Sequence, residues 1–240
     1  MAEEKSSLYI KDKDVVVPGE ILAIGLDYLP GFGTYRLENK IIASRLGLIN
    51  VDGRALKITP LSGKYLPKRN DVIICKVIDI TLNGWRLDTN SAFPAMLSLK
   101  DATSEYIERG ADLSKIYNIG EYLMVKIVAV TSQMLVDVSL KGPGLKKLPP
   151  GRIIKVNPMK VPRIIGKQGS MVSMVKKVTG CRILVGQNGV VWIQGDTINE
   201  NLAIETIKKI EQEAHVPGLT EKIEIFLKKR MEKKEKSDEK

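Results

Sequence analysis

The feature that most constrains the fold is a short glycine loop, Gly166-Lys167-Gln168-Gly169, which separates two stretches with helical patterns. The run RIIKVN (152–157), ahead of the first of these stretches, reads as a strand, and the stretch after the loop carries apolar residues at helical spacing. Ser170 is predicted to cap the start of that second helix, and Gly180 its end. Two β-branched runs follow, and then an amphipathic helix that begins at a capping box of Thr197 and Glu200. The order strand, helix, helix, strand, strand, helix predicts a small α/β unit.

The glycine loop has the chemistry of a phosphate site. Its glycines let the backbone approach a phosphate chain with no Cβ in the way. Lys167 adds positive charge, and the helix that begins near Ser170 points free N–H groups toward the same place. A tight turn between two helices, with no ligand, is the alternative interpretation. The predicted contacts in and beside the loop are Lys160, Arg163, Gly166, Lys167, Gln168, Gly169, Ser170 and Lys176.

The distribution of charge supports a polyanionic partner. The chain of 240 residues has a formal net charge of +10. Between Asp137 and Asp196 there is no acidic residue, whereas eleven Lys and Arg residues fall in that stretch. A long stretch of one sign in a folded region attracts polyanions, of which nucleic acid is the first candidate. An anionic membrane surface is a weaker candidate, because no amphipathic helix with an aromatic face accompanies the charge.

Two β-rich segments precede the α/β unit. In the first, apolar runs alternate with turn signals, and Asp52-Gly53 is a strong hairpin signal. The second has strand-like runs, with an Asn83-Gly84 hairpin between the first two and a polar stretch between the third and fourth, as in a five-stranded OB barrel. The glycines and prolines of residues 142–151 then predict a linker. The expected organisation is a small N-terminal β domain at 1–65, an OB domain plus linker at 66–149, the α/β unit at 150–227, and a charged, disordered tail at 228–240.

The last two folded segments resemble known RNA-binding domains. The α/β unit resembles the type I KH domain, whose loop clamps the backbone of about four nucleotides. The preceding barrel resembles the OB domain named after ribosomal protein S-one, in strand order and in endings such as VDVSLK. That resemblance implies an aromatic residue on the second strand, a place that Trp85 fills with Phe93 nearby, although both side chains could instead pack in the barrel core or at its rim. The RNA contacts expected in the barrel are Trp85, Arg86, Phe93, Lys100, Arg109 and Lys126.

The order of the three domains resembles the cap subunit of the archaeal RNA exosome. The stretches VPGE (17–20), GFGTY (31–35) and PLSGKYLPKRNDVIICKV (60–77) look like landmarks of that family, which often has glycine at the positions of Asn70 and Cys75. Its Gly-x-Asn-Gly motif matches residues 186–189, a tight turn between two strands in which an RNA contact is the less favoured interpretation.

The resemblance also implies an assembly and a role. Three caps would sit on a hexameric ring of RNase-PH-like subunits, with the N-terminal domain docked on the ring and the OB domains around its pore. RNA would thread into the ring and be degraded from 3′ to 5′ by phosphorolysis. The cap would recruit RNA and perform no chemistry itself.

The residues themselves give no sign of catalysis. The sequence contains no P-loop, no GxSxG motif and one histidine, so we expect a protein that is not an enzyme and needs no cofactor or metal. Cys75 and Cys181 lie in apolar runs and are expected to be buried. A charged N-terminal stretch without a signal-peptide core favours a cytoplasmic location. The alternatives are a free-standing OB/KH transcription or translation factor, and a scaffold whose KH domain binds only protein.

Overall fold

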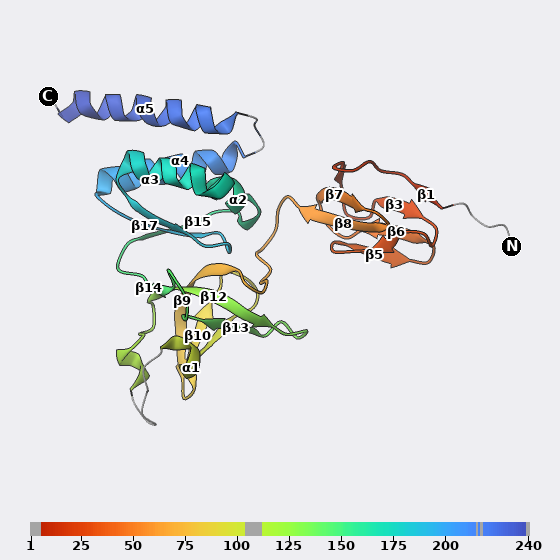
Figure 1. Cartoon of the computed structure of the whole chain (residues 1–240), viewed down its shortest axis with the longest axis horizontal. Coiled ribbons are helices and arrows are strands. Elements are labelled where there is room, and N and C mark those ends of the chain that lie inside the picture. The colour runs from red at the N-terminus through yellow and green to blue at the C-terminus, as the bar shows by residue number, and fades with distance from the viewer. Residues whose placement is uncertain (1–5, 104–111, 215, 217, 239–240) are drawn as a thin grey trace. The chain divides into compact units, whose positions relative to one another are not determined.

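The protein divides into two compact units, Met1–Gly63 and Lys64–Lys240 (Figure 1). A computed structural model describes residues 6–103, 112–214, 216 and 218–238, with side chains described as far as Arg230. The first unit is built of short strands. The second contains a β-barrel and a helical α/β domain. The predicted fold class, a β domain followed by an OB barrel and a KH domain, is confirmed.

The first unit packs two small sheets around an aliphatic core that includes Leu22, Ile41 and Ile49. The predicted Asp52-Gly53 hairpin forms, with Asp52 paired to Ala55 and Gly53 at a φ of +60°. One sheet has the order β1 (Ser7–Leu8), β3 (Ile21–Ile24), β6 (Lys40–Ala43), β5 (Thr34–Leu37), and the other β2 (Val15–Val16), β7 (Gly47–Asp52), β8 (Ala55–Pro60), β4 (Leu29–Pro30).

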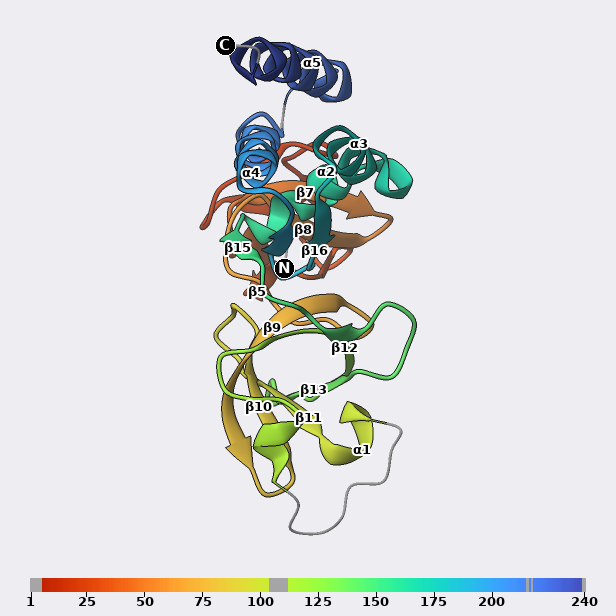
Figure 2. The ribbon, with the colours of Figure 1, turned by 90° about the vertical axis from the view of Figure 1, so that its left-hand side faces the viewer.

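The barrel of the second unit is closed, as Figure 2 shows from the side of the molecule. Neighbouring strands pair antiparallel except β11 and β13, which pair in parallel and bring the third and fifth strands together. A final pairing of β13 with β12 completes the ring, which is the strand order of an OB fold. The barrel strands are β9 (Val72–Thr81), β10 (Gly84–Asp88), β11 (Ala95–Ser98), β12 (Tyr122–Val130) and β13 (Val136–Ser139).

The polar stretch after β11 is partly helical, with α1 (Leu99–Ala102) and the 3₁₀ turn η1 (Leu113–Lys115). The predicted linker is more ordered than its glycines and prolines suggested. Within it, β14 (Lys146–Lys147) pairs with β12, and Leu148 is buried. Residues 146–151, which we call the strap, are therefore packed against the barrel instead of forming a free tether.

The α/β domain has the predicted order of elements. Its strands β15 (Arg152–Lys155), β17 (Val190–Gln194) and β16 (Arg182–Val185) form an antiparallel sheet in that spatial order. Two caps differ from prediction: Gly169 caps α3 (Ser170–Thr179), and Asp196 precedes α4 (Thr197–Gln212). The helix begins one residue earlier than the Thr197 capping box requires, and the carboxylate of Glu200 accepts from the N–H of Gly195. The remaining elements of the domain are η2 (Pro158–Lys160), α2 (Val161–Ile165) and η3 (Lys167–Gly169).

A last helix, α5 (Leu219–Asp238), lies on the outer side of α3 and α4 (Figure 1). It runs through most of the segment that was expected to be a disordered tail. Glu, Lys, Met and Arg are good helix formers, and Lys228 forms an ion pair with Glu224 one turn away, at 2.9 Å. Among the described helices, none is both long and apolar enough to cross a membrane.

Candidate nucleic-acid interface

The glycine loop adopts a conformation that its sequence requires. Gly166 has a φ of +77° and Gly169 a φ of +81°, values that L-residues rarely adopt. A Cβ on Gly166 would lie 2.7 Å from the backbone nitrogen of Met171, so this position also needs glycine for space. At Gly169 the nearest atom, Oγ of Ser173, is 3.9 Å away, so the need there is conformational. Between them Gln168 is exposed, with a φ of +52°.

A hollow of about 680 Å³ opens beside this loop. Its floor includes the buried side chains of Met171 and Leu219, and its rim carries the exposed cations Arg163 and Lys167. Among the described residues that line the hollow, none is acidic. The lining residues are Pro162, Arg163, Gly166, Lys167, Ser170, Met171, Gly218, Leu219 and Thr220. The hollow thus combines positive charge, two hydroxyl groups and free space, which suits a phosphate of a nucleic-acid backbone.

Two of the predicted contacts in this domain lie elsewhere. The Lys160 ammonium donates to the backbone carbonyl of Glu211, near the carboxyl end of α4, at 2.9 Å. This is a favoured place for a cation, so Lys160 stabilises the helix end instead of joining the hollow. Lys176 is half-buried on α3 and does not line the hollow. Arg163, Gly166, Lys167 and Ser170 line the hollow, whereas Gln168 and Gly169 belong to the same loop without lining it. As RNA contacts, these six residues remain predictions.

The barrel corrects the prediction for Trp85. Its side chain is 0 % exposed and belongs to the barrel core, where its indole N–H donates to the backbone carbonyl of Tyr117 at 2.9 Å. The two rings meet edge to face, with centroids 5.1 Å apart. A base cannot stack on a ring that is enclosed, so Trp85 is not an RNA-stacking residue. Phe93 is half-buried and packs against the same core.

The outer face of the barrel is mixed in charge. Arg86 is exposed on β10, opposite Asp79 on β9 and Met96 on β11, and Met96 lies opposite Asp137 on β13. Directly opposite residues share a face of a sheet, so the one cation in this row has carboxylates nearby. Of the other predicted contacts, Lys100 is exposed on α1 and Lys126 is half-buried on β12, whereas Arg109 lies outside the described residues.

Replacing Trp85 with phenylalanine tests its structural role. The variant loses the bond to the Tyr117 carbonyl and leaves a cavity, so we expect a cost of about 1–3 kcal/mol in unfolding free energy. The affinity of the folded protein for RNA should stay within about twofold, because the ring does not reach solvent. Urea unfolding followed by the fluorescence of Trp192, together with RNA titration, measures both. A large loss of affinity with unchanged stability would contradict this assignment.

The turn Gly186-Gln187-Asn188-Gly189 joins the two domains of the second unit. The Asn188 side chain is 0 % exposed; its amide donates to the carbonyls of Ile74 and Thr89, at 2.8 Å each. Gln187 exchanges two bonds with Val72: its backbone N–H donates to the Val72 carbonyl at 2.9 Å, and its side-chain oxygen accepts from the Val72 N–H at 2.8 Å. This motif fastens the KH domain to the barrel, and Asn188 has no surface to offer RNA.

An apolar cluster continues this contact. Ile74 of the barrel packs with Leu148 of the strap and with Val190 and Trp192 of β17. The sequence VVWIQ of β17 is buried on both faces, because Val191 and Ile193 face the helices while Val190 and Trp192 join this cluster. Such uninterrupted apolar runs are typical of strands covered on both sides.

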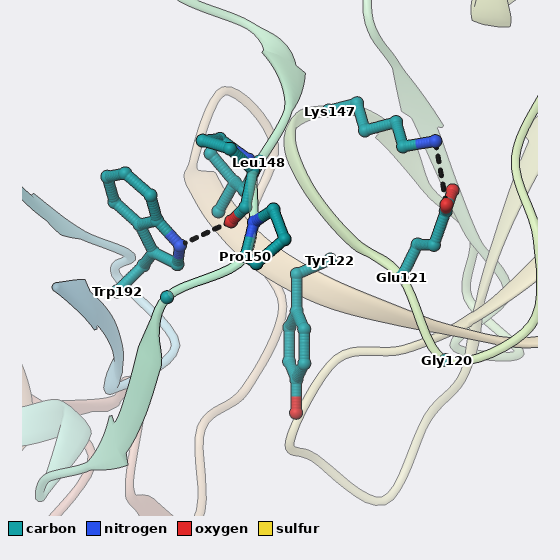
Figure 3. Close-up of a pocket in the computed structure, with 9 residues that line it drawn as sticks. Gly120, Glu121, Tyr122, Lys147, Leu148, Pro150 and Trp192 are labelled. Atoms are coloured by element: carbon teal, nitrogen blue, oxygen red, sulfur yellow. Dashed lines mark hydrogen bonds and ion pairs between the residues drawn. The ribbon is translucent and has the colours of Figure 1, made fainter. Parts of the chain in front are cut away.

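A second hollow, of about 520 Å³, lies where the barrel, the strap and β17 meet (Figure 3). The indole N–H of Trp192 donates to the carbonyl of Pro149 at 3.0 Å, and Lys147 pairs with Glu121 at 2.7 Å. Burial alone would raise the pKa of Glu121. Hydrogen bonds from Lys147 and from the backbone of Asn118, together with the charge of Lys147, outweigh that effect and lower the pKa. None of the predicted RNA contacts lines this hollow, and its cation is already paired within the protein.

Within the described residues, no group of three or more His, Cys, Asp or Glu side chains could hold a metal ion. Cys75 and Cys181 are both buried free thiols, and burial raises the pKa of each above its usual value. The single histidine, His215, lies outside the described residues.

Sequence reasoning missed three features, which are the Asn188 contact, the strap and the contribution of α5 to the loop hollow. Only the last of these features is foreshadowed by a pattern in the local sequence. Leu219, Ile223 and Leu227 recur every fourth residue, which predicts a helix with a buried face.

Comparison with known proteins agrees with this architecture. A profile described as the exosome complex exonuclease RRP4 N-terminal region matches residues 15–52, and a KH domain profile matches residues 151–199. The exosome complex component Rrp4 of Methanothermus fervidus is 42 % identical over 221 residues, covering 92 % of this chain and 97 % of that protein. Rrp4 of Pyrococcus abyssi is 38 % identical over 229 residues, covering 94 % and 86 %.

A solved crystal structure whose description names the exosome complex and RNA binding aligns with a TM-score of 0.65 and 29 % identity. The alignment covers 72 % of this chain and 99 % of that one. Both the N-terminal region and the KH domain thus have counterparts in one family, and the curated relatives match over nearly the whole chain. The chain belongs to the Rrp4 family of exosome complex components.

Proposed function

We propose that this chain is an RNA-binding cap subunit of an archaeal exosome, which recruits RNA and guides it to a phosphorolytic 3′ to 5′ exoribonuclease ring. The observation that carries this proposal is the cationic hollow beside the Gly166–Gly169 loop, in a chain of the Rrp4 family. Phosphate contacts from Arg, Lys, hydroxyl groups and backbone N–H groups position a nucleic-acid strand without reading its sequence. The site therefore suits a subunit that accepts many RNAs.

Each of the three domains would have its own role in the cap. Residues 1–65 would dock on a hexameric ring of RNase-PH-like subunits, with three caps per ring. Residues 66–149 would lie beside the RNA path, and residues 150–227 would hold the RNA backbone at the glycine loop. The mixed charge around Arg86 supports a weaker RNA contact for the barrel than for the loop. The cap itself would be non-catalytic and cytoplasmic, and it would need no cofactor.

The assembly can be tested by mixing the purified chain with the ring subunits and weighing the complex by native mass spectrometry. We expect three copies of this chain per hexamer. A chain that binds RNA but ignores the ring would instead be a free-standing RNA-binding factor. A chain that joins the ring without binding RNA would be a scaffold.

A further inference from the structure

Helix α5 lies outside the residues that match the KH profile, which end at 199, yet it packs on the core of that domain. Leu219 is 3 % exposed, and Ile223 and Leu227 are 0 % exposed. These side chains recur at i, i+4 and i+8, so a continuous stripe of the helix is buried against the domain. Burial of three large aliphatic side chains holds the helix firmly on the domain, because it removes a large apolar area from water.

Charged contacts fix the position of α5 further. The Lys209 ammonium on α4 lies 4.2 Å from the ring centroid of Phe226, and Arg230 pairs with Glu205. Both contacts join α5 to α4, the helix that crosses the KH domain beneath it. Leu219, in the amino-terminal turn of α5, is itself buried in the domain core, so that turn is held in one place relative to the glycine loop.

That place is the rim of the loop hollow. Gly218, Leu219 and Thr220 line the hollow together with Arg163 and Lys167. Leu219 is buried in the floor, whereas Thr220 is exposed at the rim. Threonine hydroxyls are ordinary partners of phosphate oxygens, and the described lining adds two cations with no carboxylate.

We propose that α5 completes the phosphate-binding site of the KH domain, and that Thr220 contacts the same stretch of RNA backbone as Lys167. This inference rests on the proposed function, because it names a further residue of that RNA site. Its ligand is a backbone phosphate of single-stranded RNA. The site is thus composite, built from the glycine loop and from a helix outside the matched KH residues.

The test uses the full chain and a fluorescein-labelled oligouridylate of about eight nucleotides, longer than the roughly four that a KH loop clamps. Thr220→Asp should weaken binding roughly twofold to fivefold, since one exposed charge is worth up to about 1 kcal/mol. Thr220→Lys should strengthen binding by about twofold to fivefold. It should also steepen the salt dependence of affinity by about 0.7 in logarithmic slope, the value of one added phosphate contact.

Thr197 provides the matched control. It is an exposed threonine in the first turn of α4, and it does not line the hollow. Thr197→Asp and Thr197→Lys make the same changes in net charge and should alter affinity by less than about twofold. A gain of affinity in Thr220→Lys cannot arise from misfolding, so the pair of opposite substitutions separates binding from stability.

The loop variant Gly169→Asp separates the inference from the proposed function. If Gly169→Asp weakens binding while both Thr220 variants behave like the Thr197 variants, α5 is not part of the site and the inference fails alone. If neither Gly169→Asp nor Thr220→Asp weakens binding, RNA does not use this hollow, and the proposed function of the KH domain fails with it.

Discussion

Replacing Asn188 with alanine is expected to destabilise the second unit by about 2–4 kcal/mol, because it leaves buried backbone groups without partners. The Asn188 amide is enclosed and donates to two carbonyls, and its oxygen accepts from the Ile74 N–H at 3.3 Å. Truncation removes all three bonds and opens a cavity at the junction of the barrel and the KH domain. Asn188→Asp should be at least as damaging, since it replaces the amide donor with an acceptor that faces two carbonyl oxygens.

Urea unfolding followed by tryptophan fluorescence is a selective measurement for this variant. Both tryptophans of the chain belong to the second unit, Trp85 in the barrel and Trp192 in the KH domain, so the first unit contributes no tryptophan signal. With a urea slope of about 2 kcal/mol/M, a loss of roughly 3 kcal/mol lowers the midpoint by about 1.5 M.

Gln187 supplies the control for Asn188. It is the neighbouring residue of the same turn and bonds to Val72, but its side chain is exposed. Water can replace the lost bond in Gln187→Ala, so that variant should lose at most about 1 kcal/mol. Equal losses in the two variants would show that the Asn188 bonds do not fasten the domains.

Replacing Gly169 with aspartate is expected to weaken the binding of single-stranded RNA by more than about tenfold. The substitution puts a carboxylate on the loop next to Ser170 and two residues from Lys167, both of which line the loop hollow, and close like charges cost several kcal/mol. The nearest atom to a Cβ there is 3.9 Å away, so the fold has room for the side chain. Fluorescence anisotropy against a labelled oligoribonucleotide measures the effect.

Gly180 is a matched control at the opposite end of the same helix. It has a φ of +66°, and no atom lies within 4 Å of the place that a Cβ would take, so Gly180→Asp carries a similar backbone strain and the same change of charge. It lies about 15 Å away along the ten residues of α3. Gly180→Asp should retain most of the affinity of the unchanged chain. If both variants lose affinity equally, the effect is one of net charge or stability, and the loop is not the site.

Local patterns predicted the parts of the fold that local chemistry determines. The hairpin at Asp52-Gly53, the αL end of α3 at Gly180 and the order of elements in the KH domain all follow from turn residues and periodicity. The glycine loop was also predicted, because a Gly-x-x-Gly pattern between two helices is visible in the sequence. Asn70 shows the same logic: its φ of +72° is one that asparagine tolerates better than most residues.

Contacts between distant parts of the chain could not be predicted in this way. The Asn188 amide meets Ile74 across 114 positions of sequence, and no local pattern records that partner. Trp85 lies on a strand with alternating faces, and only closure of the barrel decides that its face is the inner one. The hollow gains Thr220 because α5 folds back on the KH domain, which depends on burial of Leu219 and Ile223.

RNA recruitment by the glycine loop is tested most directly by the rate at which a ring of RNase-PH-like subunits degrades single-stranded RNA in phosphate, at sub-saturating RNA. The rate is measured for the ring alone, with this chain, and with Gly169→Asp, after native mass spectrometry has established equal assembly of both caps. We expect that this chain raises the rate and that the Gly169→Asp cap leaves the rate close to that of the ring alone. A Gly169→Asp cap that accelerates decay as well as the unchanged chain would contradict the claim that the glycine loop recruits RNA.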